Sequence, residues 1–407
     1  MAISEAALDA VPGDLLTRAR ALQPATVRLR RALHRRPEVG MDLPRTQDQI
    51  VRALSDLPVT LHRGRSCSSV VGVLEGDRPG PTVLLRGDMD ALPLTEDTGL
   101  AFRSEVDGAM HACGHDTHVA MLASAARLLA EDREQLAGRV LLMFQPGEEG
   151  FHGARAMLDD GLLETEAGVP EAAFALHVSA TTPSGELHHR PGPMMAAADV
   201  LRVRVTGRGG HASAPQNALD PVPAAAAMVG ALQTAVTRRV APHDQAVLTV
   251  SRITAGTTDN VIPETAELEG TMRTLSEPVR ALLRTEITRV CEHTALAHGC
   301  TAEVTIVPGY PVTVNDDGAS ADLARVGARV LGAARCVDMP SPLMGAEDFA
   351  YVLGRVPGAL AFVGARPDGL DPDTAPPNHS NRVVFDESAM ASGVAVHVGI
   401  ARAVLAR

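Results

Sequence analysis

Side chains that can bind metals or move protons concentrate in eight consecutive positions, from His111 to His118. This stretch holds one thiol, three imidazoles and a carboxylate. Cys113 and His115 are two residues apart, so both can face one ion on an irregular turn, whereas a helix would separate them. Gly114 between them permits a tight backbone. The alternative is a buried cysteine near surface histidines, but the spacing favours a metal site at the start of the alanine-rich helix that follows.

Three further segments carry candidate ligands, namely Glu149, His177 and His379. Thiolate, imidazole and carboxylate together suit zinc or a neighbouring divalent metal. Five ligands exceed what one catalytic ion with an open position takes from a protein. Two ions that share a bridging thiolate would use all five, and two-metal hydrolases have such pairs of ions. The sequence therefore predicts a dinuclear metal centre with Cys113 as the shared ligand.

Glu148 and Glu149 form an adjacent carboxylate pair after an apolar run. Neighbouring carboxylates at the end of a strand point in different directions, so one can bind an ion while the other does not. The second carboxylate can take a proton from the attacking water and later give it to a leaving amine. An exposed acidic pair is the ordinary alternative, but the apolar strand before it and the cysteine–histidine turn favour catalysis.

The elements that would position these residues are four apolar runs, each typical of a strand buried on both faces. In three cases acidic or imidazole residues follow the run, at the sheet edge where α/β proteins build their sites. Such strands predict an α/β fold with a doubly wound, mostly parallel sheet. The runs lie at 83–85, 140–144, 172–176 and 359–363. Residues 14–55 read as helical with a break at 37–40, and a last helix is expected from Glu387.

The middle of the chain has strictly alternating segments, which predict strands with one face in water. Helices are expected between them. The first has Asp220 as its N-cap and Pro221 at its first helical position. The alternating segments lie at 201–206, 248–253, 266–273 and 302–307. The order β-α-β-β-α-β predicts an α+β ferredoxin-like domain over 196–312, inserted into a metal-binding catalytic domain of residues 1–195 and 313–407.

Composition limits the function classes. The 407 residues are long for one core and predict two domains. A formal net charge of −12 argues against a general nucleic-acid-binding surface. The five scattered cysteines do not suggest a disulfide framework. Neither a signal peptide nor a membrane span is expected, so the prediction is a cytoplasmic protein.

At this point the chain resembles a known family. It is similar to the dinuclear metal amidohydrolases of the aminoacylase and carboxypeptidase superfamily. More narrowly, it resembles the branch with hippurate hydrolases, N-acyl-amino-acid amidohydrolases and the plant hydrolases of auxin–amino-acid conjugates. The matching runs cover nearly the whole chain in order: LHRRPE at 33–38, RGDMDALP at 86–93, HACGHDTH at 111–118, FQPGEEG at 144–150, GRGGHAS at 207–213, DNVIPETA at 259–266, GAEDFA at 345–350 and NHSN at 378–381.

The resemblance assigns roles in the catalytic domain. It implies that two divalent ions per subunit are bound by Cys113, His115, Glu149, His177 and His379, with Glu148 as general base. Other branches have histidine at the position of Asp88 and aspartate at that of Cys113, which leaves the role of Asp88 open. Asp90 is expected to orient a ligand without binding an ion. Zinc or manganese is expected, with cobalt or nickel as alternatives.

The resemblance also implies that the inserted domain is a lid and a dimerisation surface, so a homodimer or higher homo-oligomer is expected. His211 would reach the active site of the partner subunit and donate a hydrogen bond to the oxyanion. Arg273 would grip the substrate carboxylate, with Asn260 at the same end of the substrate. From the residues alone, Arg273 could equally form a surface ion pair with Glu267 or Glu269, and His211 could be an exposed turn histidine.

The predicted function is a metal-dependent hydrolase that cleaves the amide of small N-acyl amino acids into a carboxylic acid and a free amino acid. The alternative with the same centre is a dipeptidase or carboxypeptidase. Two rivals belong to other classes. One is a thiol hydrolase with Cys113 as nucleophile, and the other is a metal-binding scaffold that has lost catalysis.

Overall fold

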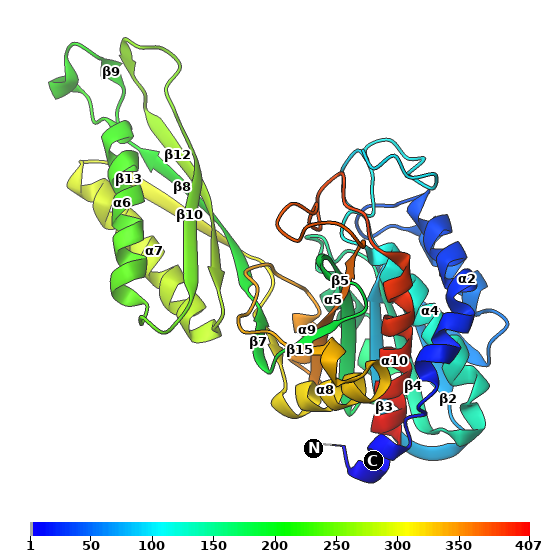
Figure 1. Cartoon of the computed structure of the whole chain (residues 1–407). Helices are drawn as coiled ribbons and strands as arrows, with labels where there is room; N and C mark the ends of the chain where they lie inside the picture. Colours follow the sequence, from blue (N-terminus) through cyan, green and yellow to red (C-terminus); the bar gives the residue numbers. More distant parts are fainter. Residues whose placement is uncertain (1–2) are drawn as a thin grey trace. The chain divides into compact units, whose positions relative to one another are not determined.

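The computed structural model describes residues 3–407, which divide into two compact units (Figure 1). The first unit comprises residues 3–192, 314–341 and 351–407, and the second comprises 193–313 and 342–350. The segment 342–350 therefore belongs with the second unit and not, as predicted, with the metal-binding domain. The two units are described in turn.

The first unit is built on an eight-stranded sheet in the order β1-β2-β4-β3-β5-β16-β6-β15. The pairs β3–β4, β3–β5, β5–β16 and β6–β15 are parallel, and the others are antiparallel. This confirms the predicted α/β fold with a mostly parallel sheet. The strands are β1 (Val59–Arg63), β2 (Val70–Glu75), β3 (Arg78–Asp88), β4 (Ala137–Gln145), β5 (Ala172–Pro183), β6 (Leu187–His189), β15 (Cys336–Asp338) and β16 (Gly358–Arg366).

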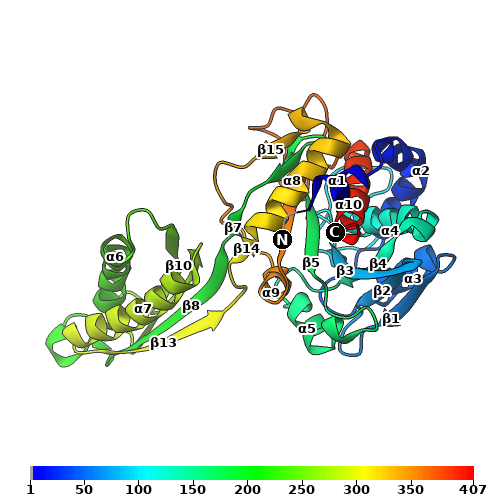
Figure 2. The same ribbon diagram turned by 90° about the horizontal axis from the view of Figure 1, so that it is seen from below.

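Helices cover both faces of this sheet because its central strands are apolar on both sides. Figure 2 shows α4, α8 and α10 on one face and α5 on the other. The helices are α1 (Glu5–Asp9), α2 (Leu15–His34), α3 (Pro44–Leu54), α4 (His115–Glu131), α5 (Gly153–Asp159), α8 (Asp317–Leu331), α9 (Ala350–Leu353) and α10 (Met390–Leu405). The predicted helical stretch 14–55 is thus two helices, α2 and α3, separated around the expected break.

One helical segment, Glu387–Leu405, is long and apolar enough to cross a membrane by length and composition. However, 94% of its most apolar window is buried inside the structure, against α2, α4 and α8. Its apolar character is therefore explained by its place in the core of the first unit. The cytoplasmic location stays a prediction.

The second unit has a four-stranded antiparallel sheet in the order β10-β12-β8-β13, with two helices packed on it. This order and the β-α-β-β-α-β sequence confirm the ferredoxin-like expectation. Asp220 accepts a hydrogen bond from Val222 N (2.9 Å) and caps the first helix as predicted. The main elements are β8 (Ala197–Thr206), α6 (Pro221–Arg239), β10 (Ala246–Ala255), β12 (Thr265–Thr274), α7 (Glu277–Ala297) and β13 (Thr301–Pro308). Shorter strands of this unit are β9 (Gly210–His211) and β11 (Val261–Ile262), whereas β7 (Gly192–Met195) and β14 (Thr313–Asn315) each include residues of both units.

Candidate metal centre

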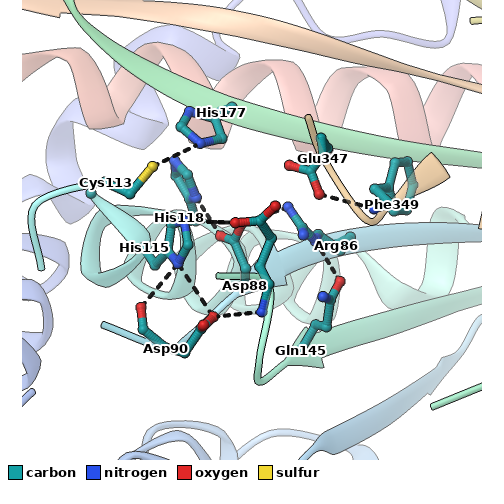
Figure 3. A network of polar contacts seen from close by, with 12 residues as sticks. Arg86, Asp88, Asp90, Cys113, His115, His118, Gln145, His177, Glu347 and Phe349 are labelled. Carbon is teal, nitrogen blue, oxygen red and sulfur yellow. Dashed lines mark hydrogen bonds and ion pairs between the residues drawn. The ribbon is translucent and has the colours of Figure 1, made fainter. Parts of the chain in front are cut away.

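The ends of three neighbouring strands bring predicted site residues of the first unit together, and Figure 3 shows Asp90, Cys113, His115 and His177 among them. β3 leads into Asp90, and β4 leads into the Glu148–Glu149 pair. His177 comes from β5. The sequence predicted that this strand ends just before His177, but it continues to Pro183. The site therefore lies at the edge of the sheet where α/β proteins place their functional groups.

The metal-binding turn is fixed by its glycine. Gly114 has a φ of +89° and is the N-cap of α4, so the helix starts at His115. A Cβ added at Gly114 would lie 2.5 Å from Cγ2 of Val178, which leaves no room for a side chain. The predicted irregular turn between Cys113 and His115 is therefore present, and only glycine fits its centre.

Cys113 is the common member of two clusters. Its Sγ lies 3.4 Å from His177 Nε2 and 3.2 Å from His379 Nε2. The side chains of Cys113, His115 and His177 offer ligand atoms within 4.8 Å of one another, and so do those of Cys113, Glu149 and His379. The structure thus places the other four predicted ligands around the sulfur of Cys113, in two sets that share it.

The histidine tautomers leave nitrogens available for a metal. His115 Nδ1 lies 2.9 Å from the carbonyl oxygen of Asp90, so this nitrogen carries the proton and donates it. His115 Nε2 is buried and makes no hydrogen bond within residues 3–407, although Asp88 Oδ2 lies 3.4 Å and Glu148 Oε2 4.0 Å from it. Burial opposes the charged ring, but Asp88 and the Cys113 thiolate outweigh burial and raise the pKa of His115 well above its usual value, so without a metal this nitrogen also carries a proton. His177 likewise donates from Nδ1 to Val178 O (2.8 Å), which leaves Nε2 beside the thiol. A divalent ion would take the place of that proton, at a buried nitrogen that no hydrogen bond satisfies.

The electrostatics favour a thiolate. Burial opposes ionisation of Cys113, but the imidazoles of His177 and His115 outweigh it and hold the pKa of the thiol well below its usual value. Hydrogen bonds to Cys113 and Glu149 raise the pKa of His379 to about 10. Burial raises the pKa of Glu149. Since thiolate is the form of cysteine that binds metals, the donor set fits the predicted ions.

Asp90 holds the acidic pair. Its two carboxylate oxygens accept hydrogen bonds from the backbone N–H groups of Glu148 and Glu149, each at 3.0 Å. The two glutamates then diverge: Glu149 Oε1 lies 3.2 Å from His379 Nε2, whereas Glu148 Oε2 lies 4.0 Å from His115 Nε2. This is the divergence expected of neighbouring carboxylates.

Asp88 and His118 already have protein partners. Arg86 Nη1 donates to the Asp88 carboxylate (2.6 Å). His118 accepts a hydrogen bond from Val178 N at Nε2 (2.8 Å), so its Nδ1 carries the proton and donates to Asp88. Burial lowers the pKa of His118 to about 4, consistent with a neutral ring. Sequence reasoning gave His118 no role, although its place three residues after His115 on one helix would have brought the two together.

The three remaining predicted residues belong to the second unit. His211 is exposed on β9, and its Nδ1 accepts from Ser213 N (3.1 Å). Asn260 is exposed next to it, with its backbone oxygen bonded to Ala212 N (3.1 Å). Their roles at the substrate stay predictions.

Arg273 is half-buried on β12, and burial lowers its pKa. The suggested ion pair with Glu267 or Glu269 does not form, because these pair with Arg204 and Arg252 instead. Within residues 3–407, Arg273 has neither a hydrogen bond nor an ion pair from its side chain. A guanidinium without a carboxylate is consistent with the predicted grip on a substrate carboxylate, which stays untested.

The chain matches known proteins over most of its length. The model of "Peptidase family M20/M25/M40" matches residues 84–403. Thermostable carboxypeptidase 1 of Saccharolobus solfataricus is 36% identical over 379 residues, covering 92% of this chain and 94% of that protein. N-acetyl-L-cysteine deacetylase of Bacillus subtilis is 38% identical over 347 residues, covering 85% and 82%.

Among solved structures, the Bacillus subtilis YXEP protein, described as a dinuclear metal binding peptidase from the M20 family, is similar with a TM-score of 0.81. It is 31% identical and covers 95% of this chain and 99% of that chain. These matches confirm the resemblance found in the sequence motifs. The chain belongs to the peptidase family M20/M25/M40 and is a metal-dependent hydrolase of amide bonds.

Proposed function

We propose that this enzyme hydrolyses N-acyl amino acids to a carboxylic acid and a free amino acid. The observation that carries the proposal is the pair of ligand clusters that share Cys113, with a second carboxylate, Glu148, directly beside them. The similarity to a deacetylase of N-acetyl-L-cysteine supports an acylated amino acid as substrate. The sequence motifs support the same substrate class.

Cys113 and the four side chains around its sulfur would hold two divalent ions, zinc or manganese first, with cobalt or nickel as alternatives. When bound, such ions polarise the scissile carbonyl and lower the pKa of water. The buried Nε2 of His115, which makes no hydrogen bond within residues 3–407, and the lowered pKa of Cys113 are the features of this chain that fit them.

The residues of the chain then perform the proton transfers. A carboxylate oxygen of Glu148 accepts a proton from the attacking water and then gives it to the nitrogen of the departing amino acid. Asp90 fixes the backbone of Glu148, so that the carboxylate is held in place through the reaction. His211 of the partner subunit would donate to the oxyanion, while Arg273 and Asn260 bind the carboxylate of the substrate. This part of the proposal requires a homodimer.

A substrate panel tests the proposal. We expect the metal-loaded enzyme to cleave an N-acetylated or N-benzoylated amino acid faster than a dipeptide with a free amino group. The reverse preference would overturn it in favour of the dipeptidase or carboxypeptidase alternative, which the similarity to a carboxypeptidase supports. Dialysis against EDTA distinguishes the proposed enzyme from a thiol hydrolase. A cysteine nucleophile would keep its activity, whereas the proposed enzyme loses it and regains it with added metal.

A further inference from the structure

A second group of ionisable side chains lies buried behind the metal-binding turn, and the proposed mechanism does not use it. It consists of Arg30 and His34 on α2, Asp116 on α4, and Glu96 in the segment after β3. Each of these side chains is at most 2% exposed. Buried charges are tolerated only when they are paired, and each pairing then fixes the relative positions of the segments involved.

His34 is the centre of this group. Its Nδ1 lies 2.9 Å from Asp116 Oδ2, and its Nε2 lies 3.2 Å from Glu96 Oε2. Burial lowers the pKa of His34, but Asp116 and Glu96 outweigh burial and raise it to about 9. The ring is therefore an imidazolium at neutral pH; it donates from Nδ1 to Asp116, and its Nε2 forms an ion pair with Glu96.

On one side, His34 fixes the metal-binding turn. Asp116 follows His115 directly in the first turn of α4. Its Oδ2 also accepts a hydrogen bond from Arg30 Nε (2.9 Å). Two cationic side chains of α2 therefore hold the residue next to a predicted ligand, and they set where the N-terminus of α4 lies.

On the other side, His34 fixes the segment that carries His379. Glu96 is followed by Asp97, whose backbone N–H donates to Asn381 O (2.8 Å). The Asp97 carboxylate accepts from Arg382 Nε (2.9 Å). The backbone of His379 in turn donates to Ala112 O (2.9 Å), next to Cys113. The two ligand-bearing segments thus meet at the metal centre and are joined a second time behind it.

We propose that His34 is a positioning residue that couples the Cys113–His115 turn to the His379 segment, so that the affinity for both ions depends on it. The inference rests on the proposed function, because it takes Cys113, His115 and His379 as ligands. Within residues 3–407, no hydrogen bond, ion pair or ring contact joins His34 to these three side chains, so its effect passes through Asp116 and Glu96. Removing such a supporting contact commonly weakens metal binding by roughly 10- to 100-fold.

The test compares His34→Gln, Glu96→Gln and a matched control. Glutamine at position 34 is neutral and has both N–H donors on one nitrogen, so it cannot replace the two ring nitrogens that face Asp116 and Glu96. Glu96→Gln leaves the contact with Asp116 in place. The control is Arg402→Gln, which breaks another buried ion pair of 2.8 Å, between Arg402 and Asp132. Asp132 is the C-cap of α4, at the opposite end of that helix from the metal-binding turn. The control therefore reports general destabilisation without disturbing the ligands.

The full-length proteins are stripped of metal and titrated with Zn²⁺ against a chromophoric chelator, and with Co²⁺ for the thiolate-to-cobalt absorption band. We expect His34→Gln to raise both Kd values by roughly 10- to 100-fold and to shift the band. Glu96→Gln should raise one Kd, and Arg402→Gln should lower Tm while leaving both Kd values unchanged. If His34→Gln does not fold, Glu96→Gln decides: one raised Kd supports the coupling, and two wild-type Kd values contradict it.

Wild-type Kd values and an unshifted cobalt band in both variants, with only a lower Tm, would overturn the coupling and leave the proposed function intact. A wild-type protein that binds neither ion would instead overturn the proposed function, and the coupling with it. Hydrolysis assays on the wild type distinguish the two failures.

Discussion

Replacing Asp90 with asparagine tests whether the acidic pair is held by the carboxylate beneath it. Asp90 accepts from the N–H groups of Glu148 and Glu149, both at 3.0 Å. Asparagine keeps one acceptor oxygen, but its amide nitrogen is a donor and would face the other N–H. One hydrogen bond to a charged acceptor is therefore lost, and the Glu148 site is buried, so water does not replace it.

The expected cost is about 1.5–3 kcal/mol, the usual value of a hydrogen bond to a charged group. If the backbone stays in place, the cost appears as a lower free energy of unfolding. If the backbone shifts to relieve the clash between donors, Glu148 moves away from the reacting atoms and kcat falls. A cost borne entirely by the transition state corresponds to roughly a 10- to 150-fold loss of kcat.

The assay measures urea unfolding of the metal-free proteins together with kcat and metal content of the loaded ones. Asp56→Asn is the matched control, because that carboxylate is 62% exposed and its ion pair with Arg127 contributes little. The reasoning is refuted if Asp90→Asn resembles this control in both unfolding and kcat. A loss of metal alone, with kcat per bound metal unchanged, would also contradict it, because Asp90 would then act through His115 only.

Four further predictions concern single side chains. Glu148→Gln should keep its metal and its fold while kcat falls at least ~100-fold, and near-native turnover would exclude it as the base. Cys113→Ser should lower the occupancy of both ions together by elemental analysis, because the sulfur belongs to both clusters; loss of one ion would indicate a terminal ligand. Mixing inactive Glu148→Gln and His211→Ala proteins should restore up to half the activity per heterodimer, since one of its two sites then carries neither defect. If activity does not recover although subunit exchange is confirmed, His211 acts in the active site of its own subunit or has no catalytic role. Because the pKa of His34 is raised to about 9, its stabilisation of the metal-free fold is complete below the unfolded pKa of about 6.5 and lost as pH rises through 9. The free energy of unfolding of the wild type should therefore fall on the order of 3 kcal/mol more than that of His34→Gln over this range, and parallel curves would contradict the charge state.

Much of the first unit could be predicted because its buried strands are continuous apolar runs. The run at 140–144 became β4 and the run at 359–363 became β16. The alternating segments of the middle region became the antiparallel sheet of the second unit for the same reason, since side-chain period reflects burial. The short strands β6 and β15 were not predicted. Three residues carry too little periodicity to be distinguished from a loop.

The site was predicted less completely, because its support comes from contacts that are distant in sequence. Ligand types and the glycine between Cys113 and His115 are visible locally, and so were named. His34 and Asp116 are 82 positions apart, and nothing near either residue indicates that they meet. His118 was visible in the motif, but only the N–H of Val178 shows which of its nitrogens carries the proton.

The place of α10 in the core has a consequence for synthesis on the ribosome. Every residue from Met390 to Leu405 is buried, and β5 is covered along one edge by β16. When Cys113 and His177 have emerged from the ribosome, the growing chain therefore keeps an open, apolar sheet edge until these later elements emerge as well. The second unit, with most of its core between residues 201 and 300, needs none of them. Chains that end after the second unit but before β16 and α10 would carry a folded insertion on an unfinished sheet. We expect these forms of the protein to be prone to aggregate.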